Sequence, residues 1–111
     1  MHPQIPTVSV PDVDPAGDEL ILDVREDDEW SAGRIDGAVH IPMYSVPPQV
    51  AALPADRPIV VVCKMGSRSA QVTAWLCGQG YDARNLDGGM LAWAVAHRRM
   101  VADGGAHPYV A

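Results

Sequence analysis

One cysteine stands where its thiol could act as a nucleophile. Cys63 follows the apolar, β-branched run 58–62, and a short loop containing Gly66 leads from it into a segment with helical character that begins near Ser69. Backbone N–H groups of a tight loop and of a helix N-terminus can all point at one anion, and here that anion would be the Cys63 thiolate. The pattern therefore predicts an activated cysteine in a loop that also suits an anionic substrate.

The energetic requirement for such activation is modest. An ordinary thiol with a pKa near 8.5 is only about 3% thiolate at pH 7, and lowering its pKa by two units, at about 2.7 kcal/mol, makes it about three-quarters thiolate. A helix N-terminus supplies roughly 0.3–2 kcal/mol. We expect the loop donors and the nearby cations Lys64 and Arg68 to supply the rest. Lys64 is the only lysine in the chain. The competing interpretation is a cysteine that simply packs in the core.

The overall charge argues against several classes of partner. The 111 residues include 8 Lys and Arg against 14 Asp and Glu, which gives a net charge of −6. Nucleic-acid binding depends on neutralising phosphates, so we expect no nucleic-acid partner. No apolar run reaches the roughly 18 residues of a membrane span, and the first residues lack a basic and apolar leader pattern. We therefore expect a cytoplasmic protein that does not bind membranes.

Thiol and imidazole spacing gives no sign of a metal site. Cys63 and Cys77 are 14 residues apart, and the four histidines are scattered along the chain. Metal sites need closely spaced ligand pairs, so we expect no metal. Two cysteines without an export signal favour reduced thiols. Cys77 is more consistent with core packing than with a second redox role.

Short apolar runs alternate with helical patterns along the chain. Such alternation predicts an α/β domain with a mostly parallel central sheet and helices on both faces. We expect one domain over 1–111, with a core at about 5–97 and a C-terminal tail at 98–111. The predicted strands are 7–10, 19–24, 38–41, 58–62 and 82–86, and the predicted helices are 25–31, 45–53, 69–79 and 90–97.

The sheet should bring three segments together. In parallel α/β sheets, ligands bind beyond the carboxyl ends of the strands. That rule selects Asp23–Arg25, the segment from Cys63 onward, and Asp87–Gly89. The acidic run 26–29 lies in a predicted first helical turn, where acids are favourable, and we expect it to be a solvated helix start.

Four stretches, in order, resemble the motifs of single-domain rhodaneses, the rhodanese-homology sulfurtransferases. Their positions are Leu22–Arg25, Gly33–Pro42 after Trp30, Cys63–Ser69 and Asp87–Trp93. Arg34 and Asp36 depart from the usual His and Pro of the second motif, in a predicted surface turn. The resemblance implies a three-layer α/β fold and a sulfurtransferase that needs no cofactor.

The resemblance also implies a mechanism. A Cys63 persulfide would carry a sulfane sulfur from a donor such as thiosulfate to a thiophilic acceptor, either cyanide or a cellular thiol. The Cys-x4-Arg spacing from Cys63 to Arg68 is similar to that of sulfurtransferases, whereas related phosphatases and arsenate reductases use a longer Cys-x5-Arg loop. Two alternatives stay open: a persulfide relay fed by a partner protein, and a non-catalytic rhodanese-like binding module.

Three groups of candidate site residues follow. Cys63 is the expected nucleophile. Lys64 and Arg68 are candidates for attracting the donor, although the resemblance equally allows Arg68 to tie the loop in place. The remaining residues of the expected active-site loop are Met65, Gly66 and Ser67, and the expected supporting residues are Asp23, Arg25, Ser69, Gly88 and Gly89.

Overall fold

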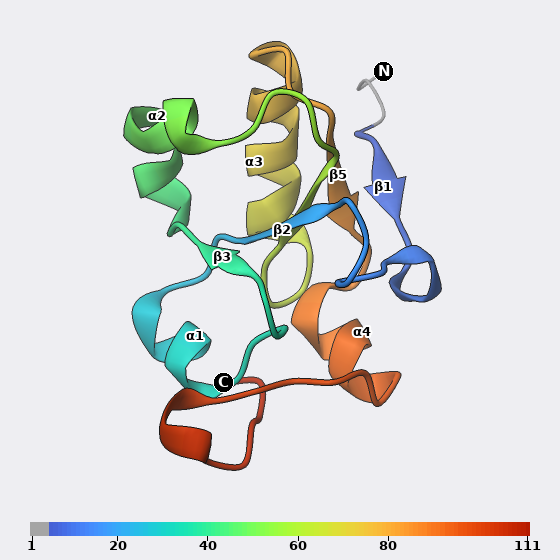
Figure 1. Cartoon of the computed structure of the whole chain (residues 1–111), viewed down its shortest axis with the longest axis vertical. Coiled ribbons are helices and arrows are strands. Elements are labelled where there is room, and N and C mark those ends of the chain that lie inside the picture. The colour runs from blue at the N-terminus through green and yellow to red at the C-terminus, as the bar shows by residue number, and fades with distance from the viewer. Residues whose placement is uncertain (1–4) are drawn as a thin grey trace.

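A five-stranded, entirely parallel sheet runs through the molecule (Figure 1). The computed structural model describes residues 5–111. The strand order is β1-β5-β4-β2-β3. The bounds are β1 Thr7–Val8, β2 Leu20–Asp23, β3 Val39–His40, β4 Ile59–Val62 and β5 Ala83–Leu86. The predicted α/β class with a mostly parallel sheet is confirmed, and each predicted strand is present.

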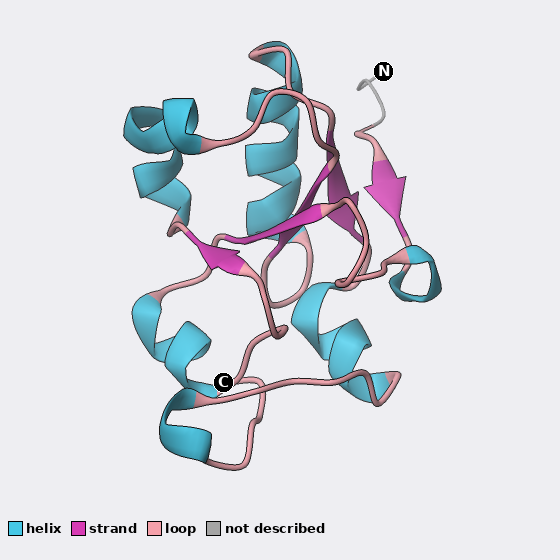
Figure 2. Cartoon of the chain, in the orientation of Figure 1, coloured by secondary structure: helices cyan, strands magenta, loops and turns pink. Residues whose placement is uncertain are grey.

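Helices connect successive strands, as parallel pairing requires (Figure 2). The α-helices are α1 Asp27–Ala32, α2 Val46–Gln49, α3 Ser67–Gly78 and α4 Gly89–Val95. Helix α3 begins two residues earlier than predicted, which places Ser67 and Arg68 in its first turn.

The continuous helix predicted over 45–53 is wrong. Two 3-10 turns, η2 Met43–Ser45 and η3 Val50–Ala52, flank the single turn of α2. Pro47 and Pro48 stand at the start of α2, where their missing N–H groups cost no helical hydrogen bond. The N–H groups of Val50 and Leu53 bond to the carbonyl oxygens of Pro47 and Val50, three residues back, so the segment continues as a 3-10 turn instead of an α-helix.

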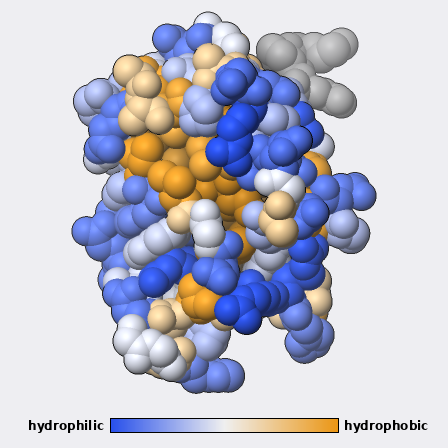
Figure 3. All heavy atoms as spheres, viewed as in Figure 1, coloured by the Kyte–Doolittle hydropathy of each residue, from blue (hydrophilic) through white to orange (hydrophobic). Residues whose placement is uncertain are grey.

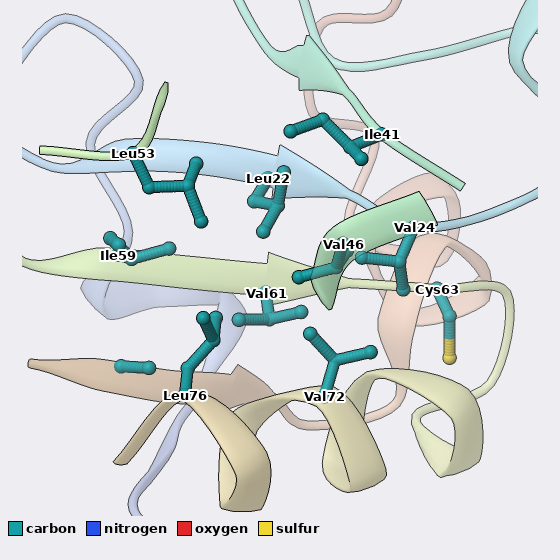
Figure 4. Close-up of a cluster of buried hydrophobic side chains, with 11 residues drawn as sticks. Leu22, Val24, Ile41, Val46, Leu53, Ile59, Val61, Cys63, Val72 and Leu76 are labelled. Atoms are coloured by element: carbon teal, nitrogen blue, oxygen red, sulfur yellow. The ribbon is translucent and has the colours of Figure 1, made fainter. Parts of the chain in front are cut away.

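The strands are apolar on both faces because helices cover both faces. Ile59 and Val61 of β4 join a buried cluster with side chains from α2 and α3 (Figure 4). Val60 and Val62 point to the opposite face and join a second cluster that includes Trp93 of α4. The three-layer arrangement therefore follows from the period-2 alternation of strand side chains.

The C-terminal tail lies against the domain. Val101 forms an antiparallel bridge with Arg34, and Arg34 pairs with Asp103 at 2.6 Å. The guanidinium of Arg98 donates to the carbonyl oxygens of Val10 and Val13, both at 2.8 Å. Arg34, which departs from the usual histidine of the second motif, thus anchors the C-terminal tail. Over residues 5–111, no helix has the length and apolar character that crossing a membrane requires.

Candidate active site

The loop between β4 and α3 wraps around the sulfur of Cys63. Figure 4 shows this sulfur pointing from the end of β4 toward the first turn of α3. The N–H of Gly66 donates to Sγ at 3.0 Å, and the hydroxyl of Ser69 donates to it at 3.1 Å. Gly66 has φ +112°, a left-handed conformation that favours glycine and allows the loop to curl back on the cysteine.

These donors favour the thiolate. Burial raises the pKa of the Cys63 thiol, but hydrogen bonds from the Ser69 hydroxyl and from the N–H groups of Ser69, Gly66 and Met65 outweigh it. The net effect holds the pKa of Cys63 below its ordinary value. Because the thiolate is the nucleophilic form, this geometry suits a reactive cysteine rather than an inert core residue.

Helix α4 holds the other side of the loop. The N–H groups of Met90 and Leu91 donate to the carbonyl oxygens of Cys63 and Lys64 at 2.8 and 3.0 Å. Gly89 has φ +57°, and a Cβ atom there would lie 2.7 Å from the carbonyl carbon of Lys64. A side chain at this position would therefore push the loop and the helix apart.

Asn85 is a loop support that the sequence analysis missed. Its side-chain amide donates to the carbonyl oxygen of Gly66 at 3.1 Å. Asn85 lies near the end of β5, next to β4 in the sheet. An asparagine inside a strand was the available signal, since such residues are depleted in strands.

Asp23 and Arg25 form a buried ion pair at the end of β2. Their side chains are 1% and 0% exposed, and the shortest N–O distance between them is 2.8 Å. Arg25 also donates to the carbonyl oxygen of Gly33 at 2.7 Å and to that of Glu29 at 3.3 Å. The pair thus fixes the C-terminal turn of α1 against the sheet and makes no hydrogen bond to Cys63.

Glu29 of α1 binds the active-site loop directly. Arg68 donates two hydrogen bonds to the Glu29 carboxylate, at 2.7 and 2.9 Å. This contact lowers the pKa of Glu29 to about 2, and the carboxylate in turn raises the pKa of Arg68. The expectation of a solvated acidic run is therefore wrong at Glu29, although Asp27 and Asp28 are exposed as predicted. The contact spans 39 residues and has no local sequence signal.

The remaining loop residues lie at the surface or near it. Met65 is 66% exposed, Ser67 is exposed and Lys64 is half-buried. Among residues 5–111, Lys64 has no carboxylate within ion-pair distance. Cys77 is partly buried, packs against the core cluster and points its sulfur at the carbonyl oxygen of Ala83 at 3.4 Å.

The family model for the rhodanese-like domain matches residues 12–96. The chain belongs to the rhodanese-like domain family. This match covers every expected site residue and confirms the resemblance inferred from the four motifs.

Individual relatives agree with the family match. The chain is 40% identical over 91 residues to the putative sulfurtransferase YtwF of Bacillus subtilis, covering 81% of this chain and 88% of the relative. It is 34% identical over 88 residues to the thiosulfate sulfurtransferase GlpE of Pseudomonas putida, covering 78% and 80% respectively. The structure of a rhodanese-related protein from Thermoplasma volcanium superposes with a TM-score of 0.84 at 25% identity, covering 88% and 99%. These relatives support a sulfurtransferase role for this rhodanese-like chain.

Proposed function

We propose that this protein transfers a sulfane sulfur from a donor such as thiosulfate to a thiophilic acceptor through a persulfide on Cys63. The observation that carries the proposal is the set of donors around one sulfur: the Gly66 N–H at 3.0 Å and the Ser69 hydroxyl at 3.1 Å. They lower the pKa of the thiol, so an attacking thiolate is available without a separate base.

The reaction is a double displacement. The Cys63 thiolate forms a bond to the outer sulfur of thiosulfate, and the sulfur–sulfur bond of the donor breaks with its electron pair leaving on sulfite. An acceptor thiol or cyanide then attacks the outer sulfur of the persulfide, and Cys63 departs as a thiolate. The loop donors that stabilise the thiolate also suit the persulfide anion, so one arrangement serves both states.

The surrounding contacts serve to keep this loop fixed. The α4 N–H groups hold the carbonyl oxygens of Cys63 and Lys64, and Glu29 holds Arg68. The buried pair of Asp23 and Arg25 positions α1, which carries Glu29. We assign these residues positioning roles, and we assign the direct contact with sulfur to Cys63 and its hydrogen-bond donors.

A steady-state transfer assay from thiosulfate to cyanide tests the proposal. We expect ping-pong kinetics in the wild-type protein and no transfer above the uncatalysed rate in Cys63→Ser. Cys77→Ser is the matched control, since it replaces the other thiol without touching the loop, and it should keep the wild-type rate. Full transfer by Cys63→Ser would refute the proposal. Turnover of an aryl phosphate or arsenate that depends on Cys63 would instead assign the loop to oxyanion chemistry.

A further inference from the structure

Gly66 is held at both of its peptide groups. Its N–H donates to the Cys63 sulfur at 3.0 Å. Its carbonyl oxygen accepts from the backbone N–H of Ala70 and from the side-chain amide of Asn85, both at 3.1 Å. Because Gly66 has φ +112° and no side chain, the residue itself offers little resistance to rotation between these two groups. The direction of the N–H toward sulfur therefore depends on what fixes the carbonyl.

The two bonds to this carbonyl attach it to supports of different stiffness. The N–H of Ala70 makes the first backbone hydrogen bond of α3, and the ends of helices fray. Gly66, the N-cap residue, has no side chain with which to cap this end. Asn85 lies in β5, which is hydrogen-bonded to β1 on one side and to β4 on the other. Its amide thus ties the loop to the interior of the sheet.

The polar side chain of Asn85 is unfavourable for the stability of β5. Its Oδ1 atom is buried and has no hydrogen-bond donor among residues 5–111. Asparagine is also depleted in strands. A buried acceptor without a partner costs free energy that an apolar side chain of the same shape does not. A side chain that weakens its strand and still holds the loop fits a functional role better than a stabilising one.

We propose that Asn85 is a positioning residue for sulfur transfer, which fixes the Gly66 carbonyl and so keeps the Gly66 N–H on the sulfur of Cys63. This role rests on the proposed function, because it serves the same Cys63 chemistry. The hydrogen bond of Asn85 goes to the Gly66 carbonyl, so its effect on the reaction passes through Gly66. When Asn85 is replaced, that carbonyl keeps the N–H of Ala70 and is not left unpaired.

Two substitutions separate this role from a structural one. Asn85→Leu keeps the branching at Cγ and removes both polar atoms. Thr73→Val is the matched control, because Thr73 is fully buried on α3 and its hydroxyl oxygen also has no hydrogen-bond partner among residues 5–111. Both variants remove a buried, unpaired oxygen, but only Asn85→Leu removes a contact with the loop. Neither residue lines the apolar hollow between α2 and α3, so both variants keep the exposed apolar surface over these helices (Figure 3).

Three quantities are measured in a Cys77→Ser parent protein, in which Cys63 is the only remaining thiol. The rate of alkylation by iodoacetamide against pH has a midpoint that reports the thiolate of Cys63. The kcat/KM with thiosulfate, with cyanide as the acceptor, reports sulfur transfer. The Tm reports stability.

We expect Asn85→Leu to raise the alkylation midpoint by about half a pH unit or more, which corresponds to about a threefold lower thiolate fraction. Its kcat/KM should fall at least about threefold for the same reason. Its Tm should equal or exceed that of the parent, because an unpaired oxygen is removed. Thr73→Val should likewise keep or raise Tm but leave the midpoint and kcat/KM unchanged. A parent-like midpoint and kcat/KM in Asn85→Leu, or the same losses in Thr73→Val, would overturn the inference.

Asn85→Asp provides a second test that does not depend on accommodating a leucine. Aspartate has the size of asparagine, but its carboxylate cannot donate to the Gly66 carbonyl. The alkylation midpoint should rise at least as far as in Asn85→Leu, and an unchanged midpoint would overturn the inference. The midpoint does not require turnover. A parent protein that takes up no sulfur from thiosulfate, with the expected midpoint shift in Asn85→Leu, would therefore refute the proposed function and still support the positioning of Gly66 by Asn85.

Discussion

The hydroxyl of Ser69 offers the sharpest test of how the loop activates its cysteine. Ser69 is fully buried, and its hydroxyl donates to the Cys63 sulfur at 3.1 Å. A hydrogen bond to a charged group contributes about 1.5–3 kcal/mol. Because the backbone donors remain in Ser69→Ala, we take the lower end, which corresponds to a rise of about one unit in the pKa of Cys63. At any pH below both pKa values, the thiolate fraction then falls about tenfold.

The rate of alkylation by iodoacetamide, followed against pH, measures this pKa directly. Only the thiolate reacts, so the midpoint of the rate profile reports the thiol pKa. Ser67→Ala is the matched control, because Ser67 is an exposed serine in the same first turn and makes no hydrogen bond to Sγ. Circular dichroism establishes that both variants fold. A Ser69→Ala midpoint equal to the wild-type midpoint would refute the assignment of Ser69 as an activating donor.

Three further predictions concern the supports of the loop. Gly89→Ala places a side chain at a left-handed backbone position against the loop carbonyls, and we expect the free energy of unfolding measured in urea to fall by about 2–4 kcal/mol. An unchanged urea midpoint would contradict the close packing of α4 on the loop. Asp23→Asn leaves Arg25 as an uncompensated buried charge, and we expect the free energy of unfolding to fall by about 3–5 kcal/mol, which lowers Tm. A variant with the wild-type Tm would contradict this role for the ion pair. The folded-state pKa of Glu29 is about 2 against an ordinary 4.5, so its stabilising effect is present above pH 4.5 and lost as pH falls toward 2. The stability difference between wild type and Glu29→Gln should therefore be largest near neutral pH and shrink at pH 3. A difference that stays constant with pH would show that the contact with Arg68 is not electrostatic.

The structural features that depend on neighbouring residues in the sequence could be predicted. The β-branched run before Cys63 and the glycine after it were enough to predict the strand, the loop and the helix that follows, because strand and turn preferences act locally. The parallel sheet then brought Asp23, Cys63 and Gly88 to one edge by a general rule. The four motifs in order identified the family.

Features that depend on distant side chains were not predictable. Arg68 had two candidate roles in the sequence, and its partner Glu29 lies 39 residues away in a run of similar acids. Nothing in the local pattern distinguishes Glu29 from Asp28, yet the helix turns one carboxylate toward the loop and the other toward solvent. The prediction of one continuous helix over 45–53 failed for a different reason. A proline early in a segment is compatible with an α-helix, so the sequence did not reveal that this segment continues as a 3-10 turn after Gln49.

The intact mass of the protein after exposure to a sulfur donor tests the central claim most directly. Wild-type protein is incubated with thiosulfate and then with cyanide, beside Cys63→Ser. We predict a gain of one sulfur, about 32 Da, that is lost on adding cyanide and never forms in the variant. A wild-type protein that gains no sulfur from thiosulfate, or a Cys63→Ser protein that gains it equally, would contradict the persulfide mechanism.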